Sequence, residues 1–440
     1  MVNKRIYLCL AHMSEAGLEQ KYIKEAFDTN WVVPLGPNVN GFEKDLEAFV
    51  GENKRVVALS AGTAAVHLGL LNCGVKAGDE VCVQSFTFCA SSHPITYLGA
   101  TPVFIDSEKD TWNMDPELLE EAIKDRVAKT GKKPKAIVPV ALYGMPYKID
   151  RIMEIASKYE IPVVEDAAEG FGSKYKGQVL GTFGKYGVLS FNGNKMITTS
   201  GGGALITENE DEWREIMMFA TQYRESYPYY QHEKIGYNYR MSNICAGIGR
   251  GQMTVVNDHI AHHKHVQALY EELLKDVKGV TVHCQPGDVI SSGGEKSQEI
   301  SPCAALSRDD IPVYDSNYWL CTITLDPDLK IKGQENAYKT IVTGAVGGAA
   351  GVIHAASSAV TDCQPNENVE ALRVFMDQAQ IEARPVWKPM HCQPVYKNAP
   401  AYVNGVSEAI FKVGMCLPAG PYVSDEDVRY IVETIKDAIA

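Results

Sequence analysis

One stretch decides the fold: IPVVEDAAEGFGSKYKGQVLGTFGKYGVLSFNGNKMITTSGGGALIT, residues 161–207. It contains short apolar, β-branched runs that change abruptly to Gly, Ser, Asn and acidic residues. This change is typical of buried strands that end in polar turns. In open α/β sheets, ligands bind at the carboxyl ends of the strands, so the polar residues after each run are candidates for a site.

The same alternation extends outward from this stretch, over residues 50–210. RVVALSAG (55–62) predicts a strand and TAAVHLGLLNCG (63–74) a helix, and later strands and helices follow in the same order. At the helix that follows Asp115, that residue is the expected N-cap, with Pro116 in the first turn. Strands that alternate with helices indicate an α/β fold with a mostly parallel central sheet between helices.

The pattern changes near residue 250, where residues 253–277 predict one long helix. We therefore expect a large domain over 1–255 and a smaller α+β C-terminal domain over 256–440. The Gly/Ser/Pro-rich stretch 285–316 is expected to be a surface insertion. Residues 340–361 are rich in alanine but contain four glycines, so their conformation is left open.

Composition excludes several classes of protein. The chain has 440 residues, 45% hydrophobic and 22% charged, which is typical of a globular protein of two or three domains. A formal net charge of −13 argues against sequence-independent nucleic-acid binding. The 11 cysteines form no C-x-x-C pair, so neither a zinc site nor a disulfide framework is indicated. We find no signal peptide or membrane span and expect a cytoplasmic protein.

Lys195 is the first candidate for chemistry. It follows an apolar strand and lies among Ser190, Asn192 and several glycines. A lysine amine in such a turn could form a Schiff base with a carbonyl compound. The segment does not match a nucleotide-binding P-loop. The alternative is an ordinary lysine on a solvated turn.

An acidic pair ends the preceding apolar strand. Glu165 and Asp166 follow IPVV, and a carboxylate buried at that place needs a cationic partner. A protonated pyridine nitrogen would be such a partner, and enzymes that use pyridoxal phosphate supply an acid there. The alternative is an N-cap for the next segment.

Two further pieces lie earlier in the chain. Ser60, Gly62 and Thr63 come where a strand turns into a helix, and free N–H groups at a helix N-terminus attract phosphate. An ordinary N-cap explains this turn equally well. Phe88, in QSFTFCAS, lies at a strand end and could stack on a flat cofactor, although aromatic residues there are more often core.

The order of these pieces resembles the DegT-type sugar-nucleotide aminotransferases, a family of pyridoxal-phosphate enzymes with the aspartate-aminotransferase (type I) fold. The resemblance covers nearly the whole chain. Seven segments carry it: 29–51, SAGTAAVHLGL (60–70), SFTFCAS (85–91), VVEDAAEGFGS (163–173), LSFNGNKMITTSGGGAL (189–205), GYNYRMSNICAGIGRGQ (236–252) and ARPVWKPMHCQPVY (383–396).

The resemblance implies roles for individual residues. Lys195 falls on the Schiff-base lysine, which also moves the proton during transfer, and Asp166 on the acid that pairs with the pyridinium nitrogen. The cofactor is then pyridoxal 5′-phosphate. The other implied cofactor residues are Gly62, Thr63, Ser190 and Asn192 at the phosphate, Phe88 on the ring, and Glu169, where family members often carry Gln or His.

A second set of implied residues concerns partners. Asn238 falls on an asparagine that family members contribute from the neighbouring subunit, which implies a homodimer with shared active sites. Segment 1–40, with Trp31, and the later Lys388 and His391 fall on regions that line the substrate pocket in relatives. Trp31 could equally be core, and Lys388 a surface charge.

The resemblance also implies a reaction. The expected substrates are L-glutamate and a nucleotide-linked 4-keto-6-deoxy sugar aminated at C4. The N-terminal segments LCLAHMS (8–14) and TNWVVPLGPNV (29–39) look most like those of members that act on UDP-linked N-acetyl sugars in the bacillosamine pathway. A C3-aminating enzyme, a dTDP- or GDP-sugar enzyme, or a non-transaminating relative is the alternative. The axial or equatorial position of the new amine is not determined.

The helix expected over 253–277 contains four histidines. His259, His262, His263 and His265 have i, i+3 and i+4 spacing, which could bind a metal. No acidic or cysteine partner is evident in the sequence, so we predict no metal site.

Overall fold

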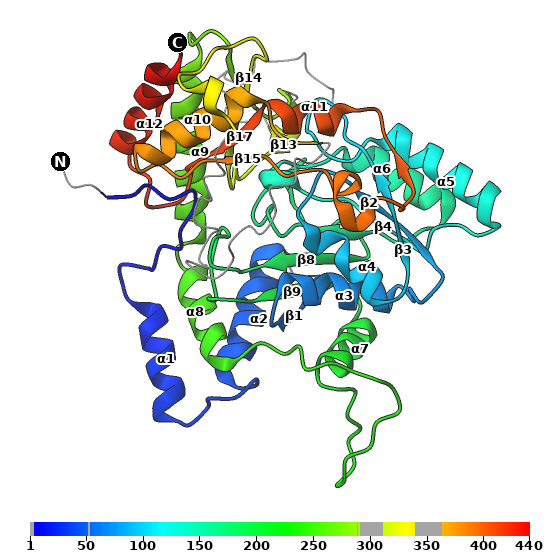
Figure 1. Cartoon of the computed structure of the whole chain (residues 1–440). Helices are drawn as coiled ribbons and strands as arrows, with labels where there is room; N and C mark the ends of the chain where they lie inside the picture. The colour runs from blue at the N-terminus through cyan, green and yellow to red at the C-terminus, as the bar shows by residue number, and fades with distance from the viewer. Residues whose placement is uncertain (1–3, 52, 288, 291–310, 339–362) are drawn as a thin grey trace.

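The computed structural model describes residues 4–51, 53–287, 289–290, 311–338 and 363–440 (Figure 1). Two four-stranded ladders, β1-β9-β8-β5 and β16-β3-β2-β4, join edge to edge into one central sheet. The joint consists of backbone hydrogen bonds, among them Asp166 N–H to the Pro139 carbonyl at 2.9 Å and Ala141 N–H to the Asp166 carbonyl at 3.0 Å. The strands are β1 (Arg55–Leu59), β2 (Glu80–Gln84), β3 (Thr101–Ile105), β4 (Ala136–Val138), β5 (Val164–Asp166), β8 (Tyr186–Ser190), β9 (Gly203–Thr207) and β16 (Ala401–Tyr402).

Most neighbours in this sheet run parallel. β2 pairs in parallel with β3 and β4, β3 with β16, and β5 with β8. β9 pairs antiparallel with both β8 and β1, which leaves β1 in the same direction as β8. The mostly parallel sheet predicted from sequence is therefore confirmed, with β9 as the antiparallel strand among those described.

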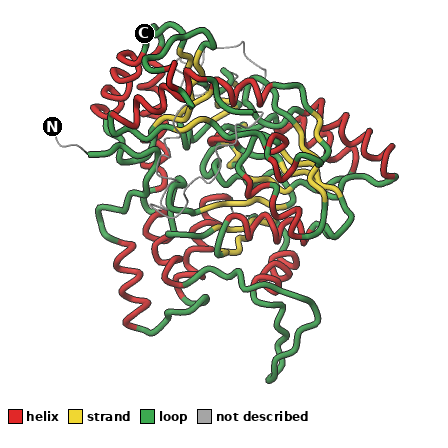
Figure 2. The backbone as a smooth tube through the Cα atoms, in the orientation of Figure 1, coloured by secondary structure: helices red, strands yellow, loops and turns green. Residues whose placement is uncertain are grey.

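Both faces of the sheet are covered, because successive side chains of a strand point to opposite faces. In β1, Val57 and Leu59 belong to one buried cluster, and Val56 and Ala58 to another. Helices flank the sheet (Figure 2) and contribute residues to both clusters. They are α1 (Leu18–Asp28), α2 (Pro37–Val50), α3 (Gly62–Asn72), α4 (His93–Tyr97), α5 (Pro116–Thr130), α6 (Ile149–Tyr159), α7 (Glu210–Ala220) and α8 (Asn243–Met253). The Asp115 side chain caps α5 as expected, accepting from Glu117 N–H and Leu118 N–H.

A second core lies in the C-terminal part of the chain. Its sheet has the order β10-β14-β17-β15, and Ile323, Leu372 and Ile431 are among its fully buried residues. The elements of the C-terminal part are α9 (Val256–Leu274), β10 (Val280–Val282), β14 (Cys321–Leu325), α10 (Glu367–Gln378), β15 (Arg384–Pro385), α11 (Val406–Val413), β17 (Gly414–Leu417) and α12 (Asp425–Ala438), and Phe411 of α11 packs in the first core. The division at residues 255 and 256 stays a proposal, and β16 returns from this part to the central sheet.

Small ladders complete the structure. β13 (Tyr314–Asp315) pairs with β6 (Lys174–Tyr175), which pairs with β7 (Gln178–Val179), and β11 (Val289–Ile290) pairs with β12 (Ile311–Pro312). Of the expected insertion 285–316, the residues 288 and 291–310 lie outside the described residues, as does all of 340–361. Single helical turns of the 3₁₀ type are η1 (Cys89–Ser91), η2 (Leu142–Gly144), η3 (Gln334–Asn336), η4 (Met390–Cys392) and η5 (Pro394–Tyr396).

The single helix expected over 253–277 is wrong at its start. α8 ends at Met253, and α9 begins at Val256. Thr254 Oγ1–H donates to the Gly251 carbonyl at 2.6 Å, and Val255 has a non-helical φ of −118° with ψ of 5°. A local side-chain hydrogen bond and β-branched residues compete here with helical geometry.

Within the described residues, no helix combines the length and apolar character that crossing a membrane requires.

A buried ion pair ties α2 to the edge of the central sheet, and it generates a stability prediction. Glu43 pairs with Arg240, each side chain is 9% exposed, and Glu43 also accepts a hydrogen bond from Ala58 N–H at 2.8 Å. Glu43→Ala leaves a buried guanidinium without its partner, so we expect a loss of about 3–5 kcal/mol of unfolding free energy. Urea unfolding followed by tryptophan fluorescence measures it.

The matched control is Lys24→Ala, which removes the exposed ion pair with Asp28 on α1. Exposed pairs contribute about 1 kcal/mol or less. Equal unfolding midpoints for the two variants would contradict the role assigned to Glu43.

Candidate active site

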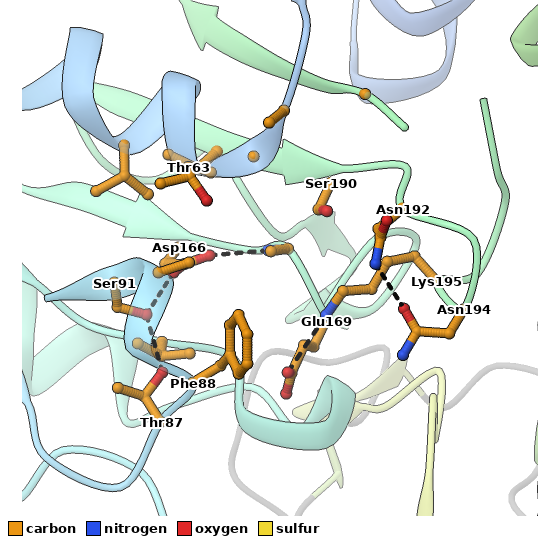
Figure 3. Close-up of a pocket in the computed structure, with 18 of the residues that line it drawn as sticks. Thr63, Thr87, Phe88, Ser91, Asp166, Glu169, Ser190, Asn192, Asn194 and Lys195 are labelled. Atoms are coloured by element: carbon orange, nitrogen blue, oxygen red, sulfur yellow. Dashed lines mark hydrogen bonds and ion pairs between the residues drawn. The ribbon is translucent and has the colours of Figure 1, made fainter. Parts of the chain in front are cut away.

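The common direction of β1, β2, β5 and β8 brings their carboxyl ends to one edge of the sheet. A cavity of about 410 Å³ lies at this edge. It is lined by residues that follow those strands and by two tryptophans from the C-terminal part: Ser60, Gly62, Thr63, Thr87, Phe88, Ser91, Asp166, Glu169, Ser190, Asn192, Asn194, Lys195, Trp319 and Trp387 among others. The candidates from four separate sequence segments therefore meet in one space (Figure 3).

Lys195 reaches the cavity from the loop between β8 and β9. The loop folds back over the sheet edge, because Phe191 N–H bonds to the Gly202 carbonyl and Thr199 N–H to the Phe191 carbonyl, both at 2.9 Å. The lysine side chain is only 12% exposed. Its Nζ lies 3.3 Å from Glu169 Oε1 and 3.9 Å from the centroid of the Trp319 ring. The alternative of a solvated surface lysine is therefore wrong.

Glu169 is also buried, and a backbone hydrogen bond fixes its carboxylate. Its side chain is 4% exposed, and Oε2 accepts a hydrogen bond from Tyr143 N–H at 2.8 Å. Tyr143 has a φ of +53°, a left-handed conformation that costs energy for a residue with a side chain. Burial raises the pKa of Glu169, and the positive charge of Lys195 opposes that rise. The carboxylate is thus positioned to hold or exchange a proton with the lysine amine.

Asp166 ends β5 and points into the cavity, whereas its neighbour Glu165 points to the opposite face, as alternation along a strand requires. Ser91 Oγ–H donates to Asp166 at 2.6 Å, and Ala168 N–H donates at 3.1 Å. Burial raises the pKa of Asp166, while the Ser91 hydrogen bond lowers it. Among the described residues, no basic side chain forms an ion pair with it. A buried acid without such a pair fits a cationic ring nitrogen.

Glu165, in contrast, does not line the cavity. Its Oε2 accepts from Phe183 N–H at 3.1 Å, and burial raises its pKa to about 7. The sequence alone does not distinguish Glu165 from Asp166, but alternation along β5 places their side chains on opposite faces of the sheet.

The N-terminus of α3 opens toward the same cavity. No described side chain caps this helix, so the first N–H groups, from Gly62 and Thr63 onward, remain available for an anion. Gly62 is required for close packing, since a Cβ there would lie 2.9 Å from Cβ of Ser190. An uncapped helix end beside a serine hydroxyl fits a phosphate group. Together with Lys195 and Asp166, it makes the cavity suitable for pyridoxal 5′-phosphate.

Phe88 forms one wall of the cavity. Its ring is 49% exposed, and its centroid lies 5.5 Å from that of Trp387. A half-exposed aromatic ring beside a polar cavity is available for stacking on a flat ligand. A second hollow of about 370 Å³ shares Thr87, Phe88 and Trp387 with the first and is also lined by Lys388. Lys388 therefore lies next to the cavity rather than in it.

Three other sequence-predicted residues lie outside the cavity. The Trp31 ring is 40% exposed, and none of the described residues in 4–40 lines the cavity. The His391 ring contacts Ser85 Oγ at 2.6 Å and Glu408 Oε1 at 3.3 Å. Asn238 is exposed, on a segment that bridges to Thr221.

Sequence reasoning missed several residues of the site. Ser91 holds Asp166, and its place in SFTFCAS was the available signal. Trp319 lies over Lys195, and its indole N–H donates to the Asn194 carbonyl at 2.6 Å. Nothing in the sequence around Trp319 indicates a partner more than 100 residues away.

The four histidines of α9 do not converge. His259 Nδ1 contacts the Met196 carbonyl, His263 Nδ1 the Tyr318 carbonyl, and His265 Nε2 the Asp425 carboxylate. Burial lowers the pKa of His259, His262 and His263. Burial therefore favours the neutral form of these three rings, and the four histidines do not form a common site.

Comparison with known proteins agrees with this geometry. A sequence profile described as the DegT/DnrJ/EryC1/StrS aminotransferase family matches residues 14–293 and 336–436. The chain is 39% identical over 438 residues to EpsN of Bacillus subtilis (strain 168), which carries the name of a pyridoxal phosphate-dependent aminotransferase. That alignment covers 99% of this chain and 96% of the relative.

A second relative and a solved structure are also similar over almost their whole length. GDP-perosamine synthase of Escherichia coli O157:H7 is 32% identical, with 98% of each chain covered. A DegT DnrJ EryC1 StrS aminotransferase from Brucella abortus has a TM-score of 0.75 at 25% identity, covering 96% of this chain and 95% of that one. The type I fold expected from the resemblance is therefore confirmed.

The Ser91–Asp166 contact generates a prediction for cofactor binding. Ser91→Ala removes a hydrogen bond that favours the ionised carboxylate, so the pKa of Asp166 should rise further. A hydrogen bond to a charged group contributes about 1.5–3 kcal/mol, and we expect pyridoxal 5′-phosphate to bind at least about tenfold more weakly. Titration of cofactor-free protein, followed by tryptophan quenching, measures this affinity.

Ser92→Ala is the matched control, because the Ser92 hydroxyl is buried next door but donates to the Cys89 carbonyl. The Ser92→Ala variant should bind pyridoxal 5′-phosphate with the affinity of the wild type. A Ser91 variant that binds the cofactor as tightly as this control would show that the hydroxyl does not tune Asp166.

Proposed function

Since the chain belongs to the DegT/DnrJ/EryC1/StrS aminotransferase family, we propose that it moves an amino group from L-glutamate to C4 of a nucleotide-linked 4-keto-6-deoxy sugar. The observation that carries the proposal is the meeting of Lys195, Asp166 and the uncapped end of α3 in one cavity. An amine, a buried acid and an anion site together suit an enzyme that uses pyridoxal 5′-phosphate.

The cofactor, when bound, supplies an aldehyde carbon and a ring that draws electrons from the substrate carbon. Asp166 holds a proton at the pyridine nitrogen, which keeps the ring cationic. Lys195 Nζ would move the proton of the donor's α-carbon, first as a base and then as an acid. Glu169, 3.3 Å from that amine, orients it and exchanges protons with it. The first N–H groups of α3 and Ser190 bind the phosphate, together with Asn192.

For the acceptor, we propose a UDP-linked sugar, because the N-terminal segments 8–14 and 29–39 resemble those of enzymes that act on UDP-linked N-acetyl sugars. The name of the relative GDP-perosamine synthase favours a GDP-linked sugar as the second candidate. Of the three substrate-side residues that the resemblance implies, we propose Trp31 and Lys388, and Lys388 has support from its place in the adjoining hollow. The His391 ring instead contacts Ser85 and Glu408. We also propose that the reaction takes place in the cytoplasm, for the synthesis of surface polysaccharide.

We further propose a homodimer with shared active sites. Asn238 lies outside the cavity of its own chain, so it could reach the phosphate only in a neighbouring subunit. The segment between α7 and α8 protrudes at the bottom of Figure 1 and carries Tyr229, Tyr230 and Ile235, which are 62%, 75% and 86% exposed. Exposed apolar groups on a projecting segment are typical of an interface between subunits.

The reaction is tested by absorbance of the protein with pyridoxal 5′-phosphate, before and after addition of L-glutamate. We expect the wild type to show a visible band that L-glutamate abolishes, because the cofactor takes up the amino group. Lys195→Ala should lack this response, with turnover lowered by at least about 10⁴-fold, since one group performs both attachment and proton transfer. Lys124→Ala, an exposed lysine on α5, is the control and should behave as wild type.

The acceptor is identified in the same experiment. Protein already converted by L-glutamate is mixed with UDP-, GDP- and dTDP-linked 4-keto sugars and with a UDP-linked 3-keto sugar, and return of the band is followed. If the band recovers fastest with the UDP-linked 4-keto sugar, the proposed acceptor is supported. If it recovers faster with another sugar, that sugar is the acceptor and the proposed one is wrong. A band that does not respond to L-glutamate would identify a non-transaminating relative.

Shared sites predict complementation between two inactive proteins. Asn238→Asp places a carboxylate against the phosphate, and Lys195→Ala removes the amine. After subunit exchange, half of the dimers are mixed, and each has one intact site, so about a quarter of the wild-type activity should return. Mixing Lys195→Ala with Asp166→Ala, which alter the same chain's contribution, should restore nothing. No recovery in the first mixture would contradict the role of Asn238.

A further inference from the structure

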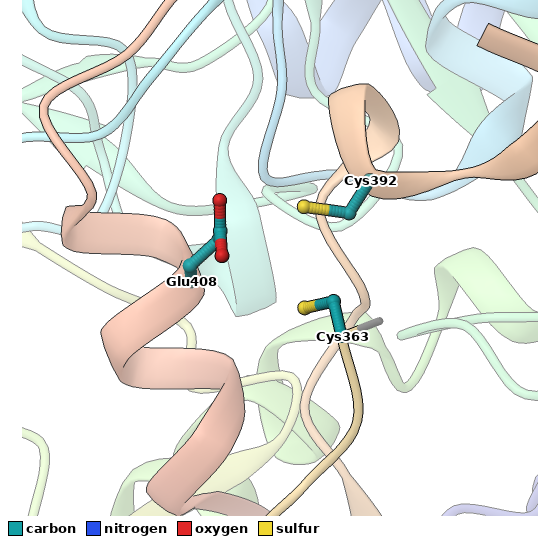
Figure 4. Close-up of side chains that lie close together, drawn as sticks. All are labelled: Cys363, Cys392 and Glu408. Atoms are coloured by element: carbon teal, nitrogen blue, oxygen red, sulfur yellow. The ribbon is translucent and has the colours of Figure 1, made fainter. Parts of the chain in front are cut away.

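Away from the cavity, three metal-ligating side chains converge from distant parts of the chain. They are Cys363, Cys392 in η4 and Glu408 in the first turn of α11 (Figure 4). The two Sγ atoms and a carboxylate oxygen all lie within 4.8 Å of one another. His391 is not part of this group of three, but it borders the group through Glu408, because its Nε2 lies 3.3 Å from Glu408 Oε1, and we take it as the fourth ligand. Two sulfurs, one oxygen and one imidazole nitrogen are the number and kind of ligands in a tetrahedral site.

The charges of the cluster suit a cation. With both thiols ionised, the two sulfurs and the Glu408 carboxylate would place three negative charges within 4.8 Å of one another. A divalent cation is the group that would turn this mutual repulsion into attraction. Lys388 and Lys412, which act electrostatically on Cys363, would offset the remaining negative charge of the ligand set.

We propose that Cys363, Cys392, Glu408 and His391 bind one zinc ion. Thiolate ligands select soft or borderline metals, and a ligand set of S₂NO type in tetrahedral arrangement suits Zn²⁺. In such a site neighbouring ligand atoms are about 3.3–3.8 Å apart, so small side-chain rotations close the group around the ion. Binding releases the thiol protons of Cys363 and Cys392 to solvent.

A supporting contact orients the histidine ligand. Ser85 Oγ lies 2.6 Å from Nδ1 of His391, which leaves Nε2 directed toward Glu408. Metal-binding histidines usually have their second nitrogen hydrogen-bonded in this manner. This arrangement gives His391 a role outside substrate binding.

The proposed ion is structural, because none of its ligands lines the cavity. It would tie α11 and the chain at Cys363 to the turn that carries Trp387, which does line the cavity. Ser85 belongs to the same wall, two residues before Thr87. The zinc site would therefore hold the side of the cavity that the C-terminal part contributes.

The test is zinc content and coordination of the full-length holoenzyme. Protein expressed in zinc-supplemented medium and passed over a weak chelator should contain about one zinc per chain. X-ray absorption at the zinc edge should show two sulfur ligands at about 2.3 Å. Cys363→Ser and Cys392→Ser should each lower zinc affinity at least about tenfold, and Ser85→Ala by about tenfold through the histidine.

Two controls separate metal loss from misfolding. Cys73→Ser alters a partly buried thiol outside the cluster and should retain wild-type zinc. Glu408→Gln, at a side chain 37% exposed, should weaken zinc binding while circular dichroism stays unchanged. Protein that takes up no zinc on titration with ZnCl₂, a zinc edge without sulfur scattering, or a Cys363–Cys392 disulfide in the untreated protein would each overturn the proposal. None of these outcomes depends on aminotransferase activity.

Discussion

The shared direction of β1, β2, β5 and β8 is the constraint on which the active site depends. Parallel strands present their carboxyl ends at one edge, so residues that follow four different strands become neighbours there. The antiparallel strand β9 determines where the lysine lies. Because it returns beside β8, the loop before it must fold back across the sheet edge, and that loop carries Lys195 over the end of β5.

Burial then gives these side chains their chemistry. In a site of low effective dielectric, the interaction between Lys195 and Glu169 is stronger than it would be in water, and each charge is costly without a partner. Asp166 is the complementary case: it is buried, hydrogen-bonded to Ser91, and suited to a cation that the protein itself does not supply. The nearby Glu165 shows that burial alone is not enough, because it faces the opposite side of the sheet.

The C-terminal part of the chain completes the cavity. Trp319 lies over the lysine amine, Trp387 packs beside Phe88, and β16 extends the central sheet. The proposed zinc site would anchor this part where it meets the large sheet. Both features depend on contacts between distant segments, such as that between Ser85 and His391, which are 306 residues apart.

Much of the fold was predictable from sequence because its elements are local. Apolar runs and capping residues such as Asp115 indicate strands and helices within a few residues. The break between α8 and α9 was missed, because the Thr254 hydrogen bond and the non-helical backbone of Val255 interrupt an otherwise helical pattern. The order of motifs was also sufficient to predict Lys195, Asp166, Gly62 and Phe88 as site residues.

Other parts of the site could be decided only by the tertiary structure. The motif SFTFCAS includes Ser91 but does not indicate that Ser91 contacts Asp166, and nothing near Trp319 in the chain indicates its contact with Lys195. The cysteines at 363 and 392 have no recognisable spacing, so the sequence predicted no metal site, yet folding brings both thiols to Glu408 and His391. The physical reason is that periodicity and capping act over one or two turns, whereas contacts between distant segments are set by how helices and strands pack around the sheet.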